Sequence, residues 1–69
     1  MIFVFKTSVK TKVQLKKLKP HIDELLPGAI WNFDLEDIDK ILRLESDEDV
    51  VLSIVNLLIH HNFCCEELK

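Results

Sequence analysis

Segments with the period of a strand alternate with segments with the period of a helix, and their order limits the folds open to this chain. Ile2 to Thr7 is apolar on both faces and predicts a strand. Thr11 and Gln14 have the spacing of a capping box, so a helix is expected to begin after Thr11. Apolar residues then recur every three or four positions and form one helix face: Leu15, Leu18, Ile22 and Leu25.

Two prolines affect this first helix, one within it and one at its end. Pro20 lies within the apolar stripe and is expected to kink or divide the helix, because proline lacks a backbone donor. Pro27-Gly28 is expected to end it. Two strands are predicted next, Ala29 to Leu35 and Lys40 to Glu45, joined by the short polar connection Glu36 to Asp39.

The C-terminal third predicts one more helix and one more strand. Ser46 or Asp47 is expected to cap a helix with an acidic first turn, which suits the positive end of the helix dipole. This helix is expected to run to about His61, and Asn62 can adopt the left-handed turn that follows it. Phe63 to Leu68 predicts a short fourth strand.

The resulting order is strand, helix, strand, strand, helix, strand. Each helix has one apolar side to bury, so an α+β fold is predicted in which two helices cover one face of a four-stranded antiparallel sheet. Right-handed crossovers place the first and third strands at the centre, as in a ferredoxin-like sandwich. A chain of 69 residues leaves room for one domain, residues 1–69.

Charge is distributed unevenly along the chain. The first 19 residues hold six lysines and no acid, whereas the remainder holds all 12 acids and only three bases. Two interpretations are open. A basic first helix could dock on an acidic partner through Lys12, Lys16 and Lys19, or the lysines could form a solvated face.

The composition predicts a soluble cytoplasmic protein. The apolar start, Met1 to Phe5, is too short for a signal peptide, and no stretch approaches the ~20 apolar residues of a membrane span. Membrane insertion is therefore not expected. The adjacent Cys64 and Cys65 are expected to be free thiols in a reducing compartment, since a disulfide between neighbours would be strained.

Five short motifs, taken in order, resemble those of the heavy-metal-associated domain family, which includes copper chaperones, soluble domains of P-type ATPases and mercury carriers. The resemblance covers nearly the whole chain and implies the ferredoxin-like fold and a role in metal carriage. The motifs are Thr7-Ser8-Val9, Leu26-Pro27-Gly28, Phe33-Asp34-Leu35-Glu36, Asn62-Phe63 and Glu66-Glu67-Leu68.

The metal loop is where this chain departs from the family. The two cysteines of the Cys-x-x-Cys motif fall on Thr11 and Gln14, and the family's methionine falls on Val9. Soft ions such as Cu(I) require thiolates, which a hydroxyl and an amide do not replace. We therefore expect Thr11 and Gln14 to cap the helix and to bind no metal, and we expect no cofactor.

A relocated metal site is the alternative. The topology places helix-end histidines and strand cysteines near Asp37, Asp39 and the altered loop, and imidazole and thiolate ligands suit zinc or copper. Adjacent residues in a strand point to opposite faces, so the two cysteines are not expected to bind together. The competing interpretation is a buried thiol beside solvated histidines. The four residues concerned are His60, His61, Cys64 and Cys65.

The second helix carries more apolar side chains than one face can bury. Those expected to face the sheet are Val51, Ile54, Val55 and Leu58. Those left over are Val50, Leu52, Leu57 and Ile59. A homodimer or a partner protein could cover the surplus, with Leu52 and Ile59 at the interface. Alternatively, some pack on the first helix and the others are exposed singly.

Other functions find less support. No catalytic triad, phosphate loop or pair of catalytic carboxylates is recognisable, so no enzyme is expected. Phe3 and Phe5 could stack bases, but the net charge of −3 argues against nucleic acid. His21 is interpreted as a surface residue and Trp31 as core. The preferred function is a protein-binding module derived from a metal carrier, and the alternative is metal trafficking at the relocated site.

Overall fold

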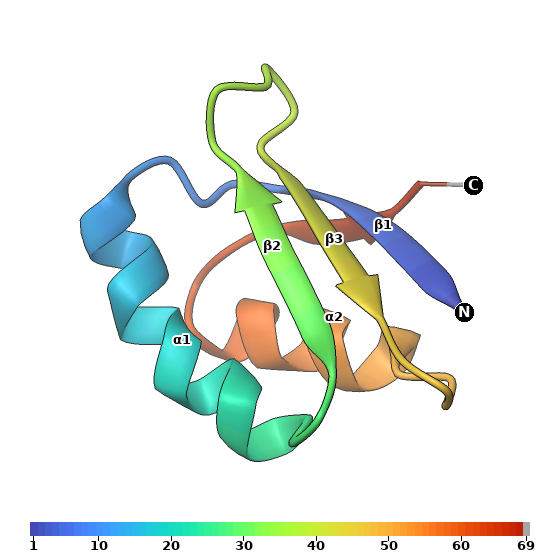
Figure 1. Cartoon of the computed structure of the whole chain (residues 1–69). Helices are drawn as coiled ribbons and strands as arrows, with labels where there is room; N and C mark the ends of the chain where they lie inside the picture. Colours follow the sequence, from blue (N-terminus) through green and yellow to red (C-terminus); the bar gives the residue numbers. More distant parts are fainter. Residues whose placement is uncertain (69) are drawn as a thin grey trace.

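The six predicted elements are present, in the predicted order, in the computed structural model, which describes residues 1–68 (Figure 1). They are β1 (Ile2–Thr7), α1 (Lys12–Leu25), β2 (Ile30–Asp34), β3 (Ile41–Glu45), α2 (Val51–His60) and β4 (Cys65–Glu67). Most boundaries lie within one residue of the prediction. The fourth strand is shorter than predicted, since only Cys65–Glu67 form paired strand residues with β1.

All strands are antiparallel in one sheet of order β2-β3-β1-β4, so the first and third strands are central, as predicted. The register aligns Phe3 with Leu44, and it aligns Phe5 and Phe33 with Leu42 on either side. Every second residue of the central strands therefore faces the same side of the sheet. This is the predicted α+β, ferredoxin-like arrangement.

Both helices pack on this apolar face, and the core lies between the layers (Figure 1). α1 contributes Leu18 and Ile22, and α2 contributes Ile54 and Leu58; all four are buried. Phe3 and Phe5 are also buried in this core, so their rings face the helices. The core residues are Phe3, Phe5, Val9, Leu18, Ile22, Phe33, Leu42, Leu44, Val50, Ile54 and Leu58.

α1 is one continuous helix, so the predicted division at Pro20 is wrong. Pro20 lies on the exposed side, where water can satisfy the Lys16 carbonyl that lacks its helical donor. The prediction that Leu25 belongs to the buried stripe is also wrong, since 42% of it is exposed. The helix ends there, and the next residue, Leu26, turns inward and packs against the core.

α2 begins later than predicted, and neither Ser46 nor Asp47 caps it. The N-cap is Val50, which makes no side-chain cap and is buried in the core. Burial of this valine fixes where the helix starts, so the acidic run remains in the preceding loop. Asp49 still accepts a hydrogen bond from the backbone N–H of Val51 at 3.2 Å, which places one carboxylate at the helix N-terminus.

The turns confirm two sequence predictions and add one residue. Gly28 has φ of 87° after the first helix, and Asn62 has φ of 68° after the second, as expected of left-handed turns. Lys40 also has a positive φ, 50°, and therefore belongs to the β2–β3 turn instead of beginning the third strand. Its ammonium group donates to the Leu35 carbonyl at 2.7 Å and closes that turn.

The apolar surplus of α2 is smaller than predicted. Val50, expected to be left over, is buried, and Leu57 packs partly against the core. Leu52 and Ile59 are 76% and 56% exposed and lie seven residues apart, so they share one face of the helix. Within residues 1–68, no helix combines the length and apolar character needed to cross a membrane.

Candidate functional site

The positions that correspond to the metal loop of the resembled family carry helix-capping side chains. The N–H of Gln14 donates to Thr11 Oγ1 at 3.1 Å, and Gln14 Oε1 accepts from the N–H groups of Thr11 and Lys10 at 3.3 and 2.8 Å. The predicted capping box is confirmed. Both polar side chains are thus used by the backbone, and neither supplies the thiolate that a soft ion requires.

The predicted relocated site divides into separate places. The segment before β4 lies against the β1–α1 loop, because Cys64 donates its N–H to Ser8 Oγ at 2.8 Å and Ser8 donates its N–H to the Cys64 carbonyl at 3.2 Å. His61 instead lies against His21 of α1, with ring centroids 4.4 Å apart. Within residues 1–68, no three His, Cys, Asp or Glu side chains are already arranged to hold one ion.

The two cysteines differ in environment. Cys64 is exposed, whereas Cys65 is half-buried and packs against the core. Burial raises the pKa of the Cys65 thiol to about 12, so this thiol is protonated at neutral pH. Because the thiolate is the form that binds metal, Cys65 is a poor ligand in this environment.

The contact between His21 and His61 predicts a pH dependence of stability. Burial, and then the neighbouring charges of His21 and His60, lower the pKa of His61 from its ordinary value of 6.5. The unfolded chain then binds more protons than the folded one, and stability is lost as the pH falls below about 6.5. Urea unfolding midpoints are expected to fall between pH 7 and pH 5 by less in His61→Gln than in the wild type. Identical pH profiles for the two proteins would refute this assignment.

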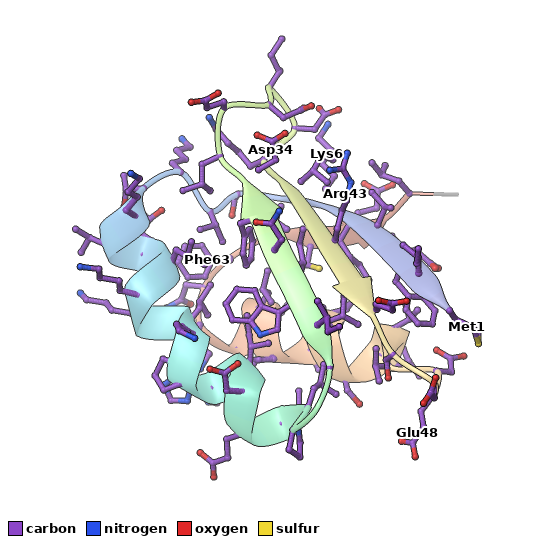
Figure 2. All side chains as sticks on the ribbon, viewed as in Figure 1. Met1, Lys6, Asp34, Arg43, Glu48 and Phe63 are labelled. Atoms are coloured by element: carbon purple, nitrogen blue, oxygen red, sulfur yellow. The ribbon has the colours of Figure 1, made fainter. Side chains whose placement is uncertain are left out.

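A groove of about 490 Å³ runs between α1 and β2. One wall is formed by Lys12, Leu15 and Lys16 of α1. The opposite wall and floor come from β2, the residues that follow it and one side chain of β3: Asn32, Phe33, Asp34, Leu35, Glu36 and Arg43. Figure 2 shows Asp34 at the end of β2 that carries the β2–β3 loop.

β2 is an edge strand, and the groove follows its free side. Among the residues that the structure describes, it pairs with β3 on one side only, so alternate residues of Ile30–Asp34 direct their backbone N–H and C=O groups away from the sheet. A free edge of this kind is a template for another strand. Here the groove provides space beside that edge.

The other end of the α1–β2 interface is closed by side chains. The Trp31 indole donates to Asp23 Oδ1 at 2.9 Å, and Lys19 Nζ lies 3.1 Å from Asp23 Oδ2. The indole hydrogen bond, followed by that of Lys19, lowers the pKa of Asp23. Lys19 Nζ also lies 5.6 Å from the centroid of the Trp31 ring. These contacts join α1 to β2, and the groove opens beyond them.

Charge in the groove is mainly basic. Within residues 1–68, neither Lys12 nor Lys16 forms an ion pair, and Arg43 adds a third positive group. Of the two acids, Asp34 already accepts hydrogen bonds from the N–H groups of its own turn, at Glu36 and Asp37. The other acid is Glu36, so the groove has an excess of positive charge, which is suited to carboxylates.

The structure divides the predicted interface residues among three places. Lys12 and Lys16 line the groove, Lys19 is engaged by Asp23, and Leu52 and Ile59 are exposed on α2. The spacing of four residues between Lys19 and Asp23 is a sequence signal for an ion pair along one helix. The Trp31–Asp23 and His21–His61 contacts had none, because they join different elements.

Comparison of this chain with protein-family models, with curated proteins and with solved structures gave no match.

Proposed function

We propose that this chain is a protein-binding module, a heavy-metal-associated-like domain without metal at its usual loop, that holds an extended acidic segment of a partner protein. The segment would lie in the α1–β2 groove and pair with the free edge of β2. The observation that carries this proposal is the juxtaposition of an unpaired strand edge with a wall that presents Lys12, Leu15 and Lys16.

Each part of the groove has a role in this binding mode. Backbone hydrogen bonds to the part of β2 that lines the groove, residues 32–34, supply affinity that does not depend on sequence, as in other cases of strand addition. Leu15 and Leu35 offer apolar contact to alternate side chains of the segment. Lys12 and Lys16 select carboxylates and disfavour basic segments through charge repulsion.

A pair of synthetic peptides tests the proposal. One alternates valine with glutamate and the other valine with lysine, so that they differ only in charge. In a ¹H–¹⁵N NMR titration, the acidic peptide is expected to bind at least about tenfold more tightly and to shift the amides of β2 and of the first turns of α1. Equal binding of both peptides, or shifts confined to the α2 side, would contradict it.

Charge reversal provides the matched control. Lys12→Glu with Lys16→Glu is expected to weaken acidic-peptide binding by about tenfold or more, since two attractions become repulsions. Lys10→Glu with Lys17→Glu makes the same change in net charge, at exposed positions that do not line the groove. Similar losses in both variants would mean that total charge, and not the groove, governs binding.

A second copy of this chain is the other occupant to be tested. Glu45, Asp47 and Glu48 line an acidic hollow of about 710 Å³ that also contains Leu25 and Ile30. A basic α1 could approach this hollow in a neighbouring copy. Sedimentation over a range of protein concentrations distinguishes the two occupants. A monomer is expected even at high concentration. Self-association that weakens with added salt would instead identify a second copy of this chain as the occupant of the groove.

A further inference from the structure

Three histidine rings meet where α1 packs against the end of α2. His21 of α1 and His61, the C-cap of α2, have ring centroids 4.4 Å apart with planes inclined by 42°. His60 extends the cluster, with its ring centroid 5.5 Å from that of His61 and planes inclined by 89°. The cluster therefore connects two helices through residues 40 positions apart in the chain, 21 and 61.

Imidazole pairs at this separation suit a divalent metal ion of intermediate softness. Zinc lies about 2.0–2.1 Å from a ligating nitrogen, which places the centroids of two rings bound to it about 4.5 Å apart at a right angle and about 5.2 Å apart at a tetrahedral angle. The observed centroid distances of 4.4 and 5.5 Å are close to these values. Nickel and zinc both accept neutral imidazole, and water can fill the remaining positions.

The rings need only local rotation to reach this arrangement. His21 and His60 are exposed and His61 is half-buried, so the first two can change rotamer without disturbing the core. Contribution of the Cys65 thiol is disfavoured, since Cys65 is packed against the core, whereas Cys64 is exposed and its role is tested below by substitution.

We propose that His21 and His61 form an interhelical clip for a zinc or nickel ion, with His60 able to supply a third imidazole. The clip is independent of the α1–β2 groove and goes beyond protein binding. Its ligands are imidazoles instead of thiolates, and binding of the ion connects two helices. An ion held by both helices joins α1 to α2 and stabilises the folded state by mass action.

Metal titration of the reduced protein tests the clip. Calorimetry with zinc and with nickel is expected to show one ion per chain, and the melting temperature should rise by several degrees at saturating metal. His21→Gln is expected to weaken binding at least tenfold while leaving the apo-protein folded, because His21 is exposed. The matched control is Cys64→Ser with Cys65→Ala, which should bind as the wild type does.

The ligand set is tested by spectroscopy on the same proteins. Cobalt bound at the clip should give a spectrum without thiolate charge-transfer bands, and paramagnetic nickel should broaden the ring resonances of His21 and His61. Unchanged affinity in His21→Gln would overturn the proposal. Loss of binding in the double cysteine variant, or absence of any binding at millimolar metal, would overturn it as well.

Discussion

Replacing Phe5 with alanine is expected to lower the free energy of unfolding by about 3–5 kcal/mol. Phe5 is 0% exposed, lies on the central strand β1 and is paired in register with Leu42 of β3. Removal of its ring leaves a cavity between the sheet and the helices, and the neighbouring elements can collapse only partly into it. A chain of this length has a total stability of ~3–10 kcal/mol, so most of it would be lost.

Urea unfolding followed by circular dichroism measures this effect. Ile38→Ala is the matched control, because Ile38 is 94% exposed and its truncation should change stability by less than about 0.5 kcal/mol. Phe5→Leu provides a milder core variant, expected to lose about 1–2 kcal/mol, for use if Phe5→Ala does not fold. Similar midpoints for the Phe5 variants and Ile38→Ala would show that the core does not lie where the structure places it.

The sequence predicted the elements well wherever a local signal agreed with the tertiary structure. The Thr11–Gln14 capping box is local chemistry, since both hydrogen bonds lie within four residues. Asn62 adopts its left-handed turn for a similarly local reason. The strand order followed from general rules of handedness and layering, which need only the order of elements and no contact between particular side chains.

The start of α2 shows where local signals fail. Ser46, Asp47 and the acids that follow form a good capping sequence, but the helix begins beyond them because Val50 is needed in the core. Ser46 and Asp49 instead accept hydrogen bonds from the nearby backbone N–H groups of Glu48 and Val51. A packing requirement thus outweighed a capping preference of about 1 kcal/mol.

The candidate sites were predictable only in part. Lys12 and Lys16 were identified from charge, but the groove beside them depends on how far α1 stands from β2. The Trp31–Asp23 hydrogen bond helps to join these two elements, and no periodicity in the sequence indicates it. His21 is exposed, as the sequence analysis expects, but its contact with His61 could not be predicted because His61 lies at the end of a different helix. Contacts between elements require coordinates, since sequence spacing defines neighbours only within one element.

Thr7 is a buried polar residue at the end of β1 whose hydroxyl joins two loops. Its Oγ1 donates to the Lys40 carbonyl at 2.6 Å and accepts from the Val9 N–H at 3.3 Å. The Thr7 N–H also donates to the Asp39 carbonyl at 3.2 Å. One side chain therefore ties the β1–α1 loop, where the resembled family has its metal motif, to the β2–β3 turn.

Thr7→Val is expected to lower the free energy of unfolding by about 1–3 kcal/mol. Valine fills the same space but leaves the Val9 N–H and the Lys40 carbonyl without the hydroxyl, and Val9 is 0% exposed, so water does not readily replace it. Thr7→Ser is the matched control, since it keeps the hydroxyl and loses only a methyl group. Hydrogen exchange at the Val9 amide should accelerate in the valine variant and change less in the serine variant. If the valine variant is as stable as the serine variant, and its Val9 amide is equally protected, the hydroxyl does not hold these two loops together.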